Sequence, residues 1–190
     1  MKNLVIFASG NGSNAQNIIE HFNNSNTARV KAVICNKPDA YVLKRAEALN
    51  TPHHLLTREE LTSSNPQKLL QLLDETDANY IILAGYLLKI PQALVEKFPH
   101  RIINIHPALL PKFGGKGMYG LHVHQAVIDA QEKETGITIH LVDTHYDSGE
   151  PLFQAKCPVF HTDTPEVLQE RVQQLEKEHF ARTIEEFISK

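Results

Sequence analysis

The chain contains no tryptophan, only two cysteines and no excess of basic residues. Cys35 and Cys157 stand far apart, in no spacing typical of a metal site or a redox pair, so we expect each to pack as a small apolar side chain in a reducing compartment. With 19 basic and 22 acidic residues, the net charge is −3. We therefore predict neither a nucleic-acid partner nor binding to an acidic membrane surface.

Long apolar runs are also missing, and the longest ones are too short to span a bilayer. The first residues lead directly into a strand-like run, with no secretory signal. We therefore expect a soluble, cytoplasmic protein. The 190 residues, 42% of them hydrophobic, fit a single domain with a continuous core.

Strand-like and helix-like segments alternate without a break over the first hundred residues. The strand-like runs are apolar throughout, as in strands that are buried on both faces, and the segments between them carry apolar residues at helical spacing. This alternation predicts an α/β, Rossmann-like fold with a mostly parallel open sheet and helices on both faces. The expected strands cover residues 4–8, 30–35, 53–56, 80–84 and 102–104.

The second half of the chain has a different pattern. Residues 113–120 include four glycines, which is typical of a mobile loop that could serve as a lid. A helix is expected at about 122–131, and residues 136–143 and 151–160 read as two strands that pair as an antiparallel extension. Thr164 followed by Pro165 and an acidic residue is typical of the start of a helix.

Polar clusters follow the ends of four expected strands, at residues 9–14, 85–90, 104–111 and 143–149. Ligands of open α/β sheets bind at the carboxyl ends of the strands. We therefore expect these four clusters to converge on one edge of the sheet.

The cluster at residues 9–14 is a glycine turn between a strand and a helix. Gly10 and Gly12 allow a tight turn, and the amides at the start of the helix favour an anion, most often phosphate. The turn lacks the third glycine of a dinucleotide fingerprint and the lysine of a P-loop. A monophosphate is therefore expected rather than NAD or ATP, and the alternative is a turn without a ligand.

The cluster at residues 104–111 holds an amide, an imidazole and two prolines. Pro107 favours an extended, rigid conformation of His106 at the exit from the strand. A rigid imidazole beside a rigid amide suits both proton transfer and oxyanion stabilisation. The alternative is a histidine with a purely structural hydrogen bond.

A carboxylate could orient this imidazole and stabilise its protonated form. Asp143 and Asp147 both follow the next strand, and the residues alone do not choose between them. His140 is a polar residue within an apolar strand and could join His106 and a carboxylate at the site. The alternative is a buried histidine that is hydrogen-bonded to the backbone. No Ser or Cys stands in a nucleophile-elbow context, so the chemistry that fits is acyl transfer to an external nucleophile.

His122, His124 and His145 could join His106 as metal ligands. No His-x-x-x-His or carboxylate spacing supports a known zinc pattern. We therefore expect no metal, and we expect structural roles for His122 and His124.

Three motifs resemble those of the phosphoribosylglycinamide formyltransferase family, which is folate-dependent. They are residues 9–14 (SGNGSN), residues 104–111 (NIHPALLP), and His140-x-Val142 followed by Asp147-x-Gly149. The resemblance covers essentially the whole chain. The middle motif is shared with other enzymes that use 10-formyltetrahydrofolate, whereas the first narrows the match to the glycinamide ribonucleotide enzymes.

The resemblance implies a reaction without a metal in de novo purine (IMP) biosynthesis. The formyl group of 10-formyltetrahydrofolate would move to the amine of N1-(5-phospho-D-ribosyl)glycinamide, also called glycinamide ribonucleotide. Asn104, His106 and Asp147 would be catalytic, and the motif selects Asp147 over Asp143. We expect Asp147 to raise the pKa of the His106 imidazole by its opposite charge.

The resemblance also implies the binding residues and a division of the single domain (1–190). Residues 1–100 would form a phosphate-binding half and residues 101–190 a catalytic and folate-binding half, in a monomer or a homodimer. The implied glycinamide ribonucleotide ligands are Gly12, Ser13, Asn14, Gln173 and Glu176. The implied folate ligands are Leu87, Leu88, Lys89, Ile90, Asn104, His140 and Asp143.

Two features depart from the family pattern. The loop at 113–120 is longer and richer in glycine than the short Pro-Gly link often found there, and the family's folate-side arginine has only Arg58 and Thr62 near its place. Methionyl-tRNA formyltransferase is a rival, but it needs a second domain and a basic surface for tRNA. Two further rivals are formyltetrahydrofolate hydrolase, which carries an amino-terminal regulatory domain, and a non-catalytic nucleotide-binding module.

Overall fold

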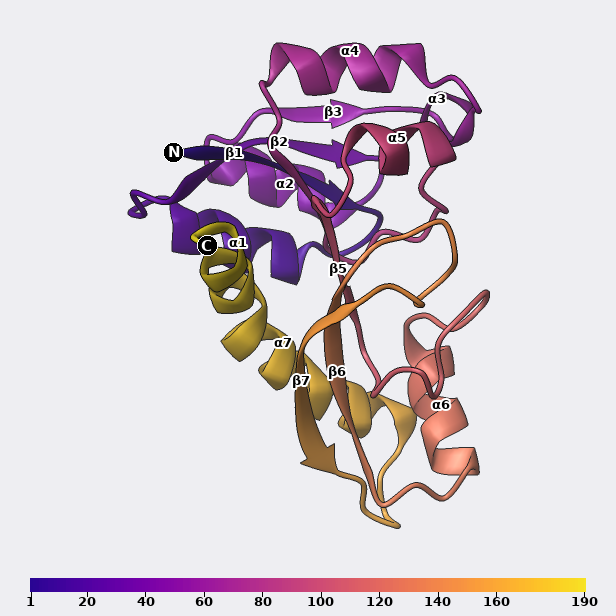
Figure 1. Cartoon of the computed structure of the whole chain (residues 1–190). Coiled ribbons are helices and arrows are strands. Elements are labelled where there is room, and N and C mark those ends of the chain that lie inside the picture. The colour runs from indigo at the N-terminus through magenta and orange to yellow at the C-terminus, as the bar shows by residue number, and fades with distance from the viewer.

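The computed structural model describes residues 1–190, which form a seven-stranded sheet with helices on both faces (Figure 1). The strand order is β3-β2-β1-β4-β5-β6-β7. The first five strands in this order pair in parallel, whereas β5–β6 and β6–β7 pair antiparallel. The strands are β1 (Lys2–Ala8), β2 (Ala28–Cys35), β3 (His53–Leu55), β4 (Tyr80–Leu83), β5 (Ile102–His106), β6 (Glu134–Leu141) and β7 (Pro151–Pro158).

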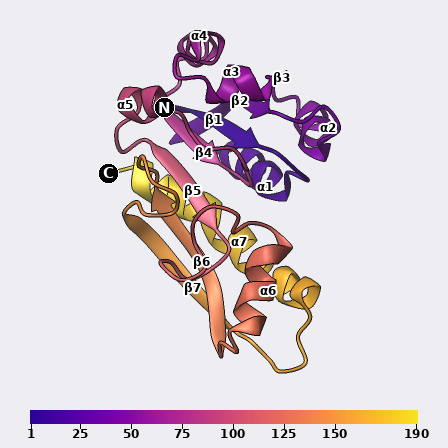
Figure 2. The same cartoon turned by 90° about the vertical axis from the view of Figure 1, so that its right-hand side faces the viewer.

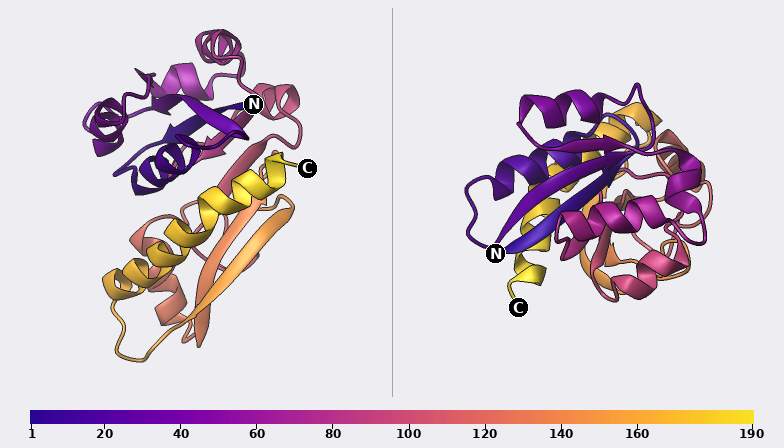
Figure 3. Two further views of the ribbon diagram at one scale, coloured as in Figure 1. Left: turned by 90° about the vertical axis from the view of Figure 1, so that its left-hand side faces the viewer. Right: turned by 90° about the horizontal axis from the view of Figure 1, so that it is seen from above.

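Seven helices accompany the sheet, and the long last helix runs across much of one face (Figure 3). This last helix begins as predicted, because the Thr164 side chain accepts a hydrogen bond from the Val167 N–H and Pro165 follows it. No helix is both long and apolar enough to cross a membrane. The helices are α1 (Ser13–Phe22), α2 (Tyr41–Ala48), α3 (Arg58–Thr62), α4 (Gln67–Glu75), α5 (Gln92–Lys97), α6 (Leu121–Asp129) and α7 (Pro165–Ile188).

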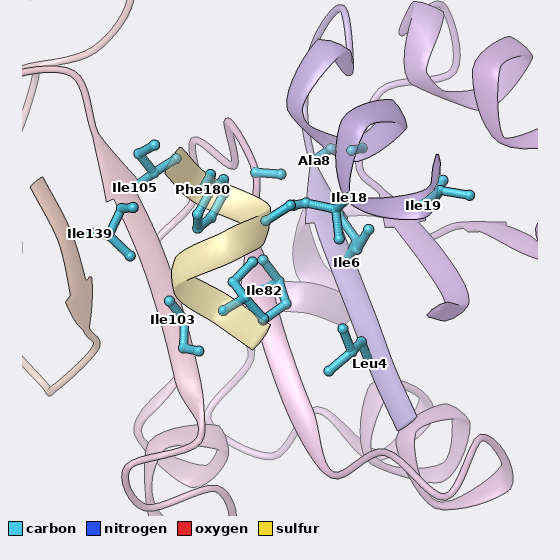
Figure 4. Packing of buried hydrophobic residues seen from close by; sticks show 14 of the residues in the cluster. Leu4, Ile6, Ala8, Ile18, Ile19, Ile82, Ile103, Ile105, Ile139 and Phe180 are labelled. Atoms are coloured by element: carbon cyan, nitrogen blue, oxygen red, sulfur yellow. The ribbon is translucent and has the colours of Figure 1, made fainter. Parts of the chain in front are cut away.

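Two apolar clusters cover the two faces of the sheet. On β1, Leu4 and Ile6 belong to the cluster beneath α1, α2 and α7, whereas Val5 and Phe7 belong to the cluster beneath α3, α4 and α5. Figure 4 shows Phe180 of α7 among the isoleucines of β4, β5 and β6. Because alternate residues of a strand point to opposite faces, a strand that is apolar throughout is buried on both. The predicted α/β open sheet with an antiparallel extension is confirmed.

Several details differ from the prediction, including the bounds of β6 and β7, which end two residues earlier than expected. Helix α3 was not expected, although Thr57 and Glu60 form a capping box that the sequence displays as Thr-x-x-Glu. Strand β5 also runs on to His106 instead of ending at residue 104. The extension arises because β5 pairs with β6 beyond the end of its parallel partner, with Asn104 opposite His140 and His106 opposite Thr138.

Candidate active site

One large cavity, of about 670 Å³, opens at the carboxyl ends of β1, β4 and β5. The four polar clusters expected to converge all contribute residues to its wall. The loop at 115–120 and one side of α7, with Gln169, Gln173 and Glu176, complete the lining. The sheet therefore brings together segments that lie far apart in the chain, such as Asn14 and Glu176, which are 162 residues apart and hydrogen-bonded.

The glycine turn before α1 has a conformation and a packing that only glycine satisfies at position 12. Gly12 has φ of +78°, and a Cβ atom there would lie 2.5 Å from the Cβ of Val42. Arg45 holds the turn from outside, since its Nε–H donates to the Asn11 carbonyl at 2.8 Å. The first amides of α1, which lack partners within the helix, are thus fixed at the cavity wall.

His106 is a buried imidazole with one nitrogen occupied. Its Nε2 lies 2.7 Å from the Phe113 carbonyl oxygen, so Nε2 carries a proton and donates it to that oxygen. Its Nδ1 lies 3.7 Å from Oδ2 of Asp147. In the neutral ring, Nδ1 is therefore an unprotonated nitrogen facing a carboxylate.

Asp147 raises the pKa of His106 as expected, but the net pKa of the imidazole is lowered. Burial lowers the pKa of the imidazole, and the charge of His140 lowers it further. Asp147 and the Phe113 carbonyl act in the opposite direction but do not outweigh burial. His106 is thus neutral at neutral pH, and a proton on Nδ1 would be stabilised locally by Asp147.

Asp147 is an ionised carboxylate held by the loop at 113–120. Burial opposes its ionisation, but His140, His106 and the Gly115 N–H together bring its pKa below the usual value for aspartate. The Gly115 N–H donates to Oδ2 at 2.8 Å, and Oδ1 lies 3.7 Å from Nε2 of His140. Asp143 instead accepts the His145 N–H at 2.7 Å and is half exposed, so Asp147 is the carboxylate beside His106.

His140 and Asn104 form a second polar pair in the same wall. The His140 Nδ1 lies 2.7 Å from the Leu141 carbonyl and must carry the proton, so its Nε2 accepts from the Asn104 amide at 3.0 Å. The predicted alternative for His140, a buried histidine bonded to the backbone, is therefore present. This hydrogen bond orients the Asn104 side chain with its amide nitrogen toward His140. The second N–H of that nitrogen can then donate to a ligand.

Sequence reasoning missed several groups at this site. Phe113 and Gly115 contribute only backbone atoms, which no side-chain pattern reveals. Of the two residues near the place of the family's folate-side arginine, Arg58 lines the cavity and Thr62 does not. Arg58 is therefore the cation at this part of the wall. No group of three or more His, Cys, Asp or Glu side chains is arranged to hold a metal ion.

Thr138 was also missed, and it ties the segment after His106 to β6. Its buried hydroxyl donates to the Ala108 carbonyl at 2.7 Å and accepts from the Leu110 N–H at 3.0 Å and from Gln154 at 2.9 Å. Ala108 lies 30 residues from Thr138 in the chain, so no local sequence pattern indicates this hydrogen bond. The hydroxyl thus holds the turn that follows His106.

Thr138→Val is expected to lower the free energy of unfolding by about 1–3 kcal/mol, because it leaves buried backbone groups at Ala108 and Leu110 without a partner. Urea unfolding measures the change. Thr138→Ser retains the hydroxyl and serves as the control. Wild-type stability of Thr138→Val, which keeps the γ-methyl and loses only the hydroxyl, would contradict the role of these hydrogen bonds.

The comparisons with known proteins agree with this geometry. A family model described as formyl transferase matches residues 2–184. The Arabidopsis thaliana protein named phosphoribosylglycinamide formyltransferase, chloroplastic, is 41% identical over 94% of this chain, which spans only 62% of that protein. The Bacillus subtilis protein named phosphoribosylglycinamide formyltransferase is 33% identical, and the match covers 99% of this chain and 95% of that protein.

A solved structure described as glycinamide ribonucleotide transformylase 1 from Symbiobacterium toebii superimposes with a TM-score of 0.91. It is 30% identical, with 100% of this chain and 88% of that chain covered. The chain belongs to the formyl transferase family.

Proposed function

We propose that this protein transfers the formyl group of 10-formyltetrahydrofolate to the amine of glycinamide ribonucleotide, in de novo purine biosynthesis. The products are the N-formyl amide and tetrahydrofolate. The observation that carries the proposal is the meeting of Asn104, His106 and Asp147 in one cavity with an anion-binding glycine turn. Membership of the formyl transferase family and relatives named for this reaction support it.

The phosphoribosyl end of the amine substrate fits the wall formed by α1 and α7. Gly12, Ser13 and Asn14 present the start of α1 to a phosphate. Glu176 accepts the Asn14 amide at 2.7 Å, and burial raises the pKa of its carboxyl. We assign Gln173 and Glu176 to the ribose hydroxyls, which offer hydrogen bonds in both directions.

We assign the folate to the wall formed by the segment after β4 and by residues of β5 and β6. The four residues assigned to it from the segment after β4 all line the cavity, as do Asn104, His140 and Asp143. The Lys89 ammonium lies 5.7 Å from the ring centre of Tyr146, so these two side chains meet across the cavity mouth. Arg58 lines the same cavity and could meet an anionic end of the folate. The four residues are Leu87, Leu88, Lys89 and Ile90.

The geometry supports a direct transfer. The amine attacks the formyl carbon, and the free N–H of Asn104 stabilises the resulting oxyanion. His106 has no free N–H at rest, because its one proton is bound to the Phe113 carbonyl. It therefore first takes a proton from the attacking amine at Nδ1, directly or through water, and Asp147 stabilises the imidazolium. The same proton then passes to the leaving nitrogen of the folate.

An assay with each substrate omitted in turn tests this proposal and its alternatives. Purified protein with both substrates should release tetrahydrofolate, and omission of the amine should stop the reaction. Formate release without the amine would favour the hydrolase, and binding without turnover would favour the non-catalytic module. The cytoplasmic location and the choice between monomer and homodimer stay predictions.

Gly12→Val is expected to weaken binding of glycinamide ribonucleotide about tenfold or more and to leave folate binding unchanged. The new side chain would push against Val42 and displace the amides that face the phosphate. Calorimetry with each substrate measures both affinities. Gly10→Ala is the control, since no atom lies within 4 Å of the added Cβ, and equal losses for both substrates would count against a local phosphate site.

A further inference from the structure

His124, on the first turn of α6, is a buried side chain with no hydrogen bond in the protein. It is only 2% exposed, and it lines the large cavity. Its Nδ1 is sealed from solvent without a partner. Its Nε2 is not sealed from solvent, and the side chain lines the cavity, so we assign the contact with a ligand to Nε2.

A buried polar group without a partner is disfavoured, so most buried groups in proteins are hydrogen-bonded. An unpartnered nitrogen at a cavity wall is therefore a candidate for a bond that forms only when a ligand binds. Burial, and in second place the charge of His106, lowers the pKa of His124 to about 4. The ring is thus neutral, and Nε2 can donate or accept a single hydrogen bond.

The position of α6 indicates which ligand lies closest. Helix α6 packs against α7, the helix that carries Gln173 and Glu176 (Figure 2). The residues assigned to the folate lie instead on the segment after β4, on β5, and on β6 and the segment after it. His124 therefore lies on the side of the cavity assigned to the phosphoribosyl substrate, close enough to His106 for the charge of one to affect the other.

We propose that His124 is a substrate-binding residue, whose Nε2 hydrogen-bonds a hydroxyl or amide group of the phosphoribosyl-glycinamide. This inference rests on the proposed function and adds a residue for which the sequence suggested only a structural role. It requires no movement of α6, since the His124 side chain already lines the cavity. The partner is a neutral polar group, because a neutral imidazole offers no charge to a phosphate.

His124→Phe tests the proposal, because phenylalanine keeps the ring and removes both nitrogens. The KM for glycinamide ribonucleotide is expected to rise about three- to tenfold, the effect of one neutral hydrogen bond, and the KM for the folate should stay unchanged. The thermal midpoint should stay the same or rise, because an unsatisfied buried nitrogen is removed. His124→Gln, which restores a polar group, should recover part of the loss.

His122→Phe is the matched control, since His122 lies two residues earlier on α6 and is exposed. It should retain wild-type kinetics. Wild-type KM values in His124→Phe would overturn the inference, and so would an equal rise in both KM values with a lower thermal midpoint. If the wild type transfers no formyl group, calorimetry with glycinamide ribonucleotide distinguishes failure of the proposed function from failure of the proposed role of His124. A weaker affinity of His124→Phe would still support the binding role, and equal affinities or no binding would reject it.

Discussion

His106→Asn is expected to lower kcat by about a hundredfold or more without unfolding the protein. Loss of the imidazole removes the group that takes the amine proton at Nδ1, and general acid–base catalysis typically contributes a factor of about 10²–10⁴. It also removes the Nδ1–H that forms when the imidazole takes up this proton. That N–H would donate to the oxyanion and to the leaving nitrogen of the folate. The Phe113 carbonyl loses the N–H that it accepts in the wild type, so the lid loop should loosen slightly.

Steady-state kinetics with both substrates saturating measures this effect, and circular dichroism and thermal unfolding check the fold. His161→Asn, an exposed position outside the cavity, is the control and should behave as the wild type. Turnover near the wild-type value in a folded His106→Asn protein would remove His106 from the mechanism. A loss of kcat together with a lower thermal midpoint would point to a structural role instead.

Asp147→Asn is expected to lower kcat about a hundredfold and to shift the pH profile of kcat/KM. The wild-type profile should fall in acid with a midpoint below 6.5, because burial lowers the pKa of His106 and only its neutral form accepts the amine proton. The Asp147 carboxylate partly opposes this lowering. Its removal should therefore move the acid midpoint to still lower pH, while the imidazolium intermediate becomes harder to form.

The pH–rate profiles of the wild type and Asp147→Asn, measured side by side, check both the sign and the loss. Asp39→Asn, an exposed position on the surface, should leave the profile unchanged. An acid midpoint that stays fixed or moves upward in Asp147→Asn would contradict the assigned electrostatics. A shift without a loss of kcat would show that Asp147 tunes His106 but does not support the transfer.

The sheet could be predicted from the sequence because its signals are local. The run from Leu4 to Ala8 is apolar at every position, which identifies a strand covered on both faces, and the turn with Gly12 requires glycine for its backbone angle. The convergence of the clusters after β1, β4 and β5 follows from parallel strands, whereas the cluster at 143–149 follows the antiparallel strand β6. The extent of β5 was missed because it depends on pairing with β6, a strand that comes much later in the chain.

The electrostatics of the site could not be predicted from residue types. The raising effect of Asp147 on the pKa of His106 could be predicted, but the net lowering is set by burial, which depends on the folded chain around the ring. The proton position on His106 is set by the Phe113 carbonyl, and the orientation of Asn104 is set through His140. Likewise, only the folded chain shows that His124 has no partner.

The most direct test of the mechanism follows the formyl carbon itself. The folate is prepared with ¹³C in its formyl group, and NMR follows the label during turnover with glycinamide ribonucleotide. Direct transfer at His106 predicts that the label leaves the folate and enters the N-formyl amide at one rate, with none in formate and none on the protein. Label in formate in the presence of the amine, or label accumulating on the protein, would contradict it.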